Sequence, residues 1–207
     1  MNSDDYLPTR HSLLHRLKNW EDQESWKDFF DTYWRFIYGV AVKAGLSDAE
    51  AQDVVQETVI TVAKKINGFQ VGRERGSFKA WLTRTTRWRI GDQFRKRARS
   101  DSSLATPGDD GPRTAVVEQV PDPASLQLDE SWEKDWEQNI LEVALENLKA
   151  KVDGETYQMF HLHIIKQWPA AKVASSVGAK VPSVYFAKYK VSRLLKKEIE
   201  RLNKDLI

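Results

Sequence analysis

The stretch WPAAKVASSVGAKVPSVYFAKYKVSRLLKK runs from Trp168 to Lys197, with a proline near its start, a glycine in its middle and lysines toward its end. It is either two helices folded on each other or one basic amphipathic helix with an interruption. Gly178 can adopt the left-handed conformation that a sharp turn between helices requires. Pro182 fits the first turn of a helix and is unfavourable inside one. These two residues favour two helices.

The first of these helices has a small apolar face at Val173, Ala174 and Val177. Ala174 is short enough to let a second helix cross closely. After the turn, Val181 and Val184 are expected to pack back onto Val173 and Val177. The pattern is typical of a helix-turn-helix module.

A helix-turn-helix places the N-terminal part of its second helix in the DNA major groove and its basic residues on phosphates. The second helix presents Ser183, Tyr185, Phe186, Lys188, Tyr189 and Lys190. The residues predicted to face the groove are Ser183, Tyr185 and Lys188, and those predicted to hold phosphates are Lys190, Arg193, Lys196 and Lys197. Lys180, just before this helix, is also predicted to bind upstream DNA. Two packed core helices with a basic rim remain the alternative.

Apolar residues recur at spacings of three and four along most of the remaining chain, which predicts further helices and an all-α fold. The predicted helices cover about 26–44, 47–66, 78–98, 126–148 and 154–166. In the first, the predicted core face is Trp26, Phe29, Phe30, Tyr33, Ile37, Val40, Ala41 and Ala44. Ser47 and Glu50 form a capping-box pattern, and Gly45 is a natural helix end.

Composition excludes several classes of protein. The 207 residues are 41% hydrophobic and contain no cysteine, which removes disulfides and thiol nucleophiles. The N-terminus lacks a signal pattern, and no run approaches the ~18 apolar residues of a membrane span, so a cytoplasmic protein without membrane insertion is expected. The histidines have no carboxylate at metal-site spacing, and no nucleophile elbow or phosphate loop occurs. We therefore expect neither an enzyme nor a cofactor or metal.

Charge is unevenly distributed, although the formal net charge is only +2. Residues 100–137 carry ten acids and two bases with four prolines, whereas 78–99 carry eight bases and one acid. This indicates two helical domains with basic segments, joined by a flexible acidic linker. The predicted boundaries are an N-terminal extension (1–25), a first domain (26–99), a linker (100–130) and a second domain (131–207).

Three stretches together resemble the extracytoplasmic-function sigma factors, which are promoter-specificity subunits of bacterial RNA polymerase. They are SDAEAQDVVQETVITVAKKI (47–66), GSFKAWLTRTTRWRIGDQFRKRAR (76–99) and the opening stretch. The resemblance covers 26–99 and about 140–200. It implies a region two-like bundle that binds core polymerase and melts the promoter, followed by a region four-like helix-turn-helix that reads the upstream element.

The resemblance also implies roles for individual residues. Asp53, Gln56 and Glu57 match a D-x-x-QE pattern that faces the polymerase clamp. The residues that match the helix facing downstream promoter DNA are Arg84, Arg87, Trp88, Arg89, Arg95, Lys96 and Arg97. Many family members have asparagine at the position of Trp88; an indole lacks the paired donor and acceptor of an amide but can stack on an unpaired base. The loop 70–77 matches the segment that captures a flipped base.

The function predicted from these features is promoter-specific transcription initiation, with core RNA polymerase and promoter DNA as partners, an anti-sigma factor as a possible further partner, and a location at the nucleoid. The alternative is a stand-alone helix-turn-helix regulator that binds DNA without polymerase. Such a regulator needs no docking face on 48–66, so that segment distinguishes the two.

Overall fold

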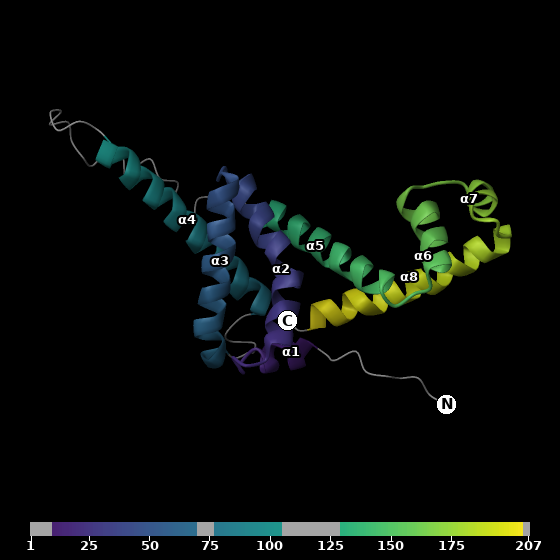
Figure 1. The fold of residues 1–207 in the computed structure, drawn as a ribbon, viewed down its shortest axis with the longest axis horizontal. Helices are drawn as coiled ribbons and strands as arrows, with labels where there is room; N and C mark the ends of the chain where they lie inside the picture. Colours follow the sequence, from purple (N-terminus) through teal and green to yellow (C-terminus); the bar gives the residue numbers. More distant parts are fainter. Residues whose placement is uncertain (1–9, 70–76, 105–128, 205–207) are drawn as a thin grey trace. The chain divides into compact units, whose positions relative to one another are not determined.

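The computed structural model describes residues 10–69, 77–104 and 129–204, and these residues form helices and no strands (Figure 1). The α-helices are α1 (Arg10–Arg16), α2 (Gln23–Lys43), α3 (Asp48–Lys65), α4 (Phe78–Leu104), α5 (Asp129–Lys149), α6 (Gly154–Phe160), α7 (Ala170–Val177) and α8 (Val181–Lys204). A 3-10 turn, η1 (Ile66–Gly68), follows α3, and a π-helix, η2 (His161–Ile165), follows α6. The predicted all-α fold class is confirmed. None of the helices in the described ranges is long and apolar enough to span a membrane.

The chain divides into two compact units between Asn139 and Ile140, within α5. The first unit holds α1 to α4 and the N-terminal part of α5, and the second holds the rest of α5 with α6 to α8. Most of the predicted acidic linker lies outside the described residues, as does the loop 70–76. The domain boundaries predicted from the sequence stay predictions.

Helix ends in the first unit follow local chemistry. Ser47 caps α3, and the capping box with Glu50 is present in full: Ser47 Oγ accepts from the Glu50 amide, and Glu50 Oε2 accepts from the Ser47 amide at 2.8 Å. Gly45, just past α2, has a φ of 95°. A side chain is disfavoured in that conformation, so glycine lets the chain turn directly from α2 into α3.

The core of the first unit lies between α2, α3 and α4. Phe29, Ile37 and Val40 of α2 are fully buried, and α3 and α4 contribute Val54, Val62, Phe78, Leu82 and Ile90. Within the stretch set apart as an N-terminal extension, α1 and the residue after it bury Leu13, Leu14 and Leu17. The prediction that Phe30 belongs to the core is wrong. Its ring is 42% exposed because α2 is apolar on two faces, and only one of them packs on α4.

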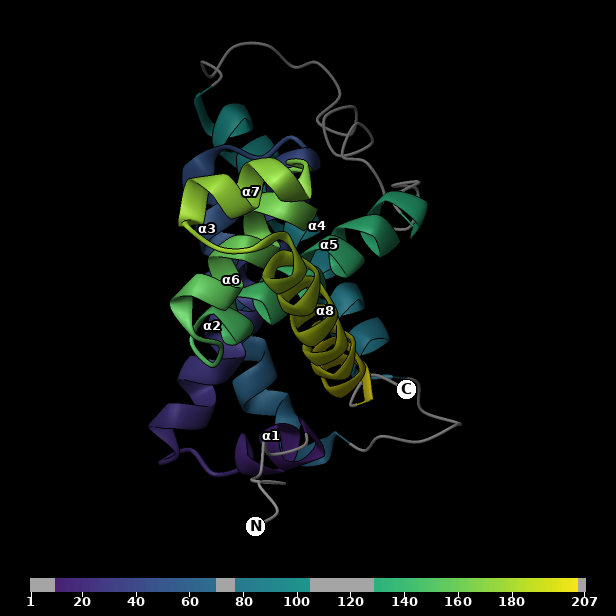
Figure 2. The ribbon, with the colours of Figure 1, turned by 90° about the vertical axis from the view of Figure 1, so that its right-hand side faces the viewer.

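The second unit contains the predicted pair of helices, α7 and α8 (Figure 2). Gly178 ends α7 with a φ of 68°, and Pro182 lies in the first turn of α8, as predicted. Val184 is fully buried against Val173 and Ala174 in one core cluster. The prediction that Val181 packs there is wrong, since it is 38% exposed at the start of α8.

The predicted helix 154–166 is interrupted. It is α-helical only to Phe160 and continues as the π-helix η2, after which Gln167 has a positive φ of 57°. A π-helix widens the turn by one residue. His163 Nδ1 lies 2.8 Å from the Trp168 carbonyl oxygen, which ties this irregular segment to the entry of α7.

Candidate docking groove and nucleic-acid surfaces

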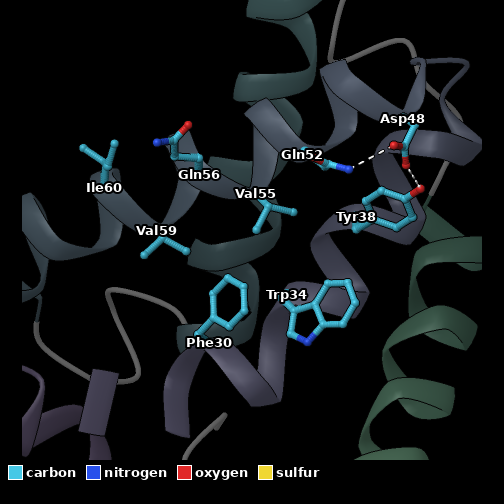
Figure 3. A pocket seen from close by; sticks show the side chains of 9 residues that line it. All are labelled: Phe30, Trp34, Tyr38, Asp48, Gln52, Val55, Gln56, Val59 and Ile60. Carbon is cyan, nitrogen blue, oxygen red and sulfur yellow. Dashed lines mark hydrogen bonds between the residues drawn. The ribbon is translucent and has the colours of Figure 1, made fainter. Parts of the chain in front are cut away.

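A groove of about 730 Å³ runs between α2 and α3 in the first unit (Figure 3). Three aromatic residues at i, i+4 and i+8 of α2, Phe30, Trp34 and Tyr38, form one wall. The α3 wall is formed by Asp48, Gln52, Val55, Gln56, Val59 and Ile60. The groove is therefore apolar along its length and polar at one end and along its rim.

The polar end is fixed by Asp48 at the start of α3. Its carboxylate accepts a hydrogen bond from the Tyr38 hydroxyl and another, at 2.9 Å, from Gln52 Nε2 (Figure 3). The bond to Asp48 raises the pKa of the Tyr38 hydroxyl. These bonds orient Tyr38 and Gln52, so this end of the groove is pre-formed.

The three residues of the D-x-x-QE pattern do not share one environment. Gln56 is exposed and lines the groove, and Asp53 is exposed on the same helix. Glu57 turns toward α4 instead, where its Oε2 lies 3.5 Å from Arg89 Nη1. The pattern therefore faces both the groove and the neighbouring basic helix.

Several cations of α4 are held by acids and hydroxyls of their own unit. Arg89 donates to Thr61 Oγ1 from Nη2 at 2.6 Å and lies 4.5 Å from the Trp88 ring centroid. Arg97 Nε donates to Glu50 Oε1 at 2.8 Å. This hydrogen bond, with those from Ser47, lowers the pKa of Glu50 from 4.5 to about 2. Arg95 pairs with Asp92 on α4 itself.

Other residues of α4 are more accessible. Trp88 is 49% exposed, and Arg84 and Lys96 are exposed. Arg84 and Arg87 border a cavity of about 470 Å³ that also involves Lys79 and the N-terminal part of α5. Arg87 stacks on Trp132 with its guanidinium carbon 5.3 Å from the ring centroid. The structure thus brings the predicted downstream-DNA residues onto one helix but leaves only some of them open.

The surface of α8 in the second unit is different. Val184, Ala187 and Val191 form its buried side, and the predicted upstream-DNA residues are all exposed: Lys180, Ser183, Tyr185, Lys188, Lys190, Arg193, Lys196 and Lys197. One of them has a weak ion pair, Lys190 at 3.9 Å from Asp153. Glu198, the first acid after this run, points inward. Burial opposes its charge, but hydrogen bonds from Arg201 and Asn147 keep the pKa of Glu198 below its usual value.

The exposed cations described above lie on the two basic helices, α4 and α8. Residues 29–100 match the family model of sigma-70 region 2. This match covers about a third of the chain, and over these residues the chain is similar to sigma-70 region 2. The match includes all of α3 and all of α4 except its last four residues. It therefore includes both the groove and the basic helix α4. A search of curated proteins finds no match to the chain.

Within the residues that match this family model, the sequence patterns did not identify the aromatic wall of the groove. Phe30, Trp34 and Tyr38 are spaced four residues apart, and this second apolar stripe on α2 was the available signal. In the second unit, Phe186 and Tyr189 were noted on α8 but given no role. Both are among its most exposed side chains.

Proposed function

We propose that this chain is an extracytoplasmic-function sigma factor that binds core RNA polymerase and directs promoter-specific transcription initiation in the cytoplasm. The observation that carries the proposal is the match to region 2. In the matched unit, α3 forms one wall of the apolar groove and also packs against the cation-rich helix α4. Strand opening by a binding protein needs no catalytic group, only phosphate contacts and surfaces that hold unpaired bases.

The polymerase clamp occupies the groove between α2 and α3 in this proposal. An apolar groove with aromatic walls suits the apolar face of a helical partner. Gln56 lines the groove and Asp53 is exposed elsewhere on α3, and their amide and carboxylate groups complement a basic surface on the clamp. A stand-alone regulator has no use for such a groove, which favours the sigma factor over that alternative.

Promoter melting is assigned to α4. Arg84 and Lys96 are exposed and suited to phosphates, and the exposed indole of Trp88 offers a face on which an unpaired base can stack. Arg89 over Trp88 holds the indole in place and adds positive charge beside it. The segment 70–76, to which base capture is assigned by resemblance, lies outside the described residues.

Upstream promoter recognition is assigned to α8, with α7 as the positioning helix. The left-handed turn at Gly178 and the burial of Val184 against Val173 fix the angle between the two helices. The exposed cations of α8 then lie along one helix in a run without acids, as phosphate binding requires.

The test is transcription in vitro with purified core polymerase. The full chain is expected to give transcripts that start at defined promoters, and Gln56→Lys is expected to reduce polymerase affinity at least tenfold, because it places a cation at the groove that receives a basic partner. The matched control is Gln158→Lys, which adds the same charge at an exposed position of α6. Duplex binding without any effect on polymerase would contradict the proposal and favour the stand-alone regulator.

A further inference from the structure

Two large rings on α8 project into solvent. Phe186 is 64% exposed and Tyr189 is 66% exposed. With ~100° between successive residues of a helix, both lie on the side opposite the buried Val184 and Val191. We name this pair the aromatic ridge. Two neighbouring rings that are this exposed on one side of α8 add nothing to the core and are available to a partner.

The charges around the aromatic ridge identify the kind of partner. From Lys180 to Lys197 the chain has six cations and no acid, and all six are exposed. Glu198 is only 2% exposed and is bonded to Arg201, so it does not neutralise this face. The core of a protein–protein interface is depleted in lysine, whereas rings among cations fit the methyl-bearing, phosphate-lined major groove of DNA. These charges favour duplex DNA over a protein as the partner of the aromatic ridge.

Phe186 is more available to a partner than the neighbouring Tyr185. The Tyr185 ring packs edge-on against His163 with 5.8 Å between centroids, so it is partly committed to the fold. Phe186 lies one residue further along the turn, on the open side of α8. Its side chain has no hydrogen-bond donor or acceptor, so it cannot read the polar edges of bases.

We propose that the aromatic ridge, and Phe186 above all, selects thymine in the upstream promoter element through its C5 methyl group. That methyl is the apolar group that the major groove presents, and contact with it distinguishes thymine from the other three bases. The cations beside the ridge hold the flanking phosphates and set the register of the helix. The inference rests on the proposed upstream-DNA role of α8 and adds to it a base and a recognition chemistry.

Deoxyuridine isolates the methyl group, because it differs from thymidine only by that group. Duplexes are first selected from a randomised library by the full chain assembled with core polymerase. Each thymine of the enriched upstream element is then replaced in turn by deoxyuridine. At one or two positions the affinity is expected to fall about fourfold, the factor that burial of one methyl-sized group contributes. In Phe186→Ala the thymine and uracil duplexes are expected to bind equally at one such position.

Two controls keep the result specific. Ile165→Ala removes another exposed apolar side chain from the second unit, outside α8, and is expected to retain the sensitivity to deoxyuridine. The second control places deoxyuridine outside the enriched element, where no effect is expected. Circular dichroism checks that Phe186→Ala and Tyr189→Ala remain folded.

The outcomes separate this inference from the function on which it rests. If a duplex is enriched but every deoxyuridine duplex binds as tightly as its parent, the thymine inference is overturned while the upstream-DNA role stands. If no upstream element is enriched, both are overturned. If the ridge variants weaken assembly with core polymerase and leave DNA affinity unchanged, the ridge is a protein-docking surface and the inference is wrong.

Discussion

The two basic helices, α4 in the first unit and α8 in the second, present their charges in opposite ways. On α4, Arg89 and Arg97 are bonded to side chains of α3, and Arg95 to Asp92. On α8 the cations point to solvent, and the acid that ends the run is buried. The two helices have a similar excess of positive charge in the sequence. In the structure the charge of α4 is partly neutralised by neighbouring acids, whereas the cations of α8 are exposed to solvent.

This difference follows from the neighbours of each helix. Helix α4 packs beside α3, whose capping acid Glu50 and motif acid Glu57 point toward it. Helix α8 packs on α7 through small apolar residues that carry no charge. A phosphate on α4 would compete with several protein carboxylates, whereas on α8 it would meet the weak pair of Lys190 with Asp153. We therefore expect α8 to dominate binding to duplex DNA, and α4 to act where unpaired bases add a stacking contribution.

The largest loss of stability is expected when the packing between α7 and α8 is disrupted. Val184→Asp places a carboxylate in a site with no exposure, where no charged partner is available, and should destabilise the second unit by more than about 3 kcal/mol. Seven of the eight tryptophans precede residue 140, so tryptophan fluorescence reports mainly on the first unit. Circular dichroism should show an early loss of helix while the main fluorescence transition stays in place.

Ser183→Asp is the control for this experiment, because it puts the same side chain at the adjacent exposed position. Its unfolding midpoint should match that of the parent. Identical melting of Val184→Asp and the parent by circular dichroism would show that Val184 is not part of a packed core.

The next effect is expected from Arg89, which holds α4 to α3. Arg89→Ala removes the hydrogen bonds to Thr61 and leaves Glu57 and Asp92 without the cation between them, so a loss of about 1–2 kcal/mol is expected. Urea unfolding measures it. Lys96→Ala, an exposed cation of the same helix, should cost less than about 0.5 kcal/mol. Equal costs for the two variants would contradict the distinction between held and open cations on α4.

Much of this architecture can be read from local sequence. The capping box at Ser47 and the glycine turn at Gly178 are both short-range patterns, and the structure has each of them. Periodicity alone could not decide which apolar face of α2 is the core, so Phe30 was misplaced. It also could not identify the partners of Arg97, because Glu50 lies 47 residues away in the chain and is brought near only by tertiary packing.

The Glu50–Arg97 pair should give a smaller effect that depends on pH. Glu50 has a pKa of about 2 in the folded chain, below its ordinary 4.5, so its contribution is complete above pH 4.5 and is lost as the pH falls toward 2. Glu50→Gln should therefore be less stable than the parent by up to about 1 kcal/mol at pH 6, and the gap should narrow steadily as the pH falls from 4.5 toward 2. Urea unfolding at pH 6, 4 and 3 measures the gap.

Arg97→Gln checks the assignment of this pair. It should cause a similar loss at pH 6, and the double variant should lose less than the sum of the two single losses, because both substitutions remove one interaction. Strict additivity would mean that Glu50 owes its low pKa to Ser47 rather than to Arg97.

The smallest change in stability is expected from a substitution on the exposed side of α8. The same substitution tests the proposed DNA-binding role most directly. Arg193 is exposed on the outward side of the helix, nine residues after the buried Val184, so Arg193→Ala should alter stability by less than about 0.5 kcal/mol. If Arg193 holds a phosphate, the slope of log affinity against log salt for duplex DNA should fall by about 1. Arg89→Ala should show the reverse, a clear loss of stability with a smaller change in slope, because its charge is already partly balanced by Glu57 and Asp92. Equal changes in slope for the two variants would mean that α3 does not restrain the cations of α4, and that α4 and α8 hold phosphates alike.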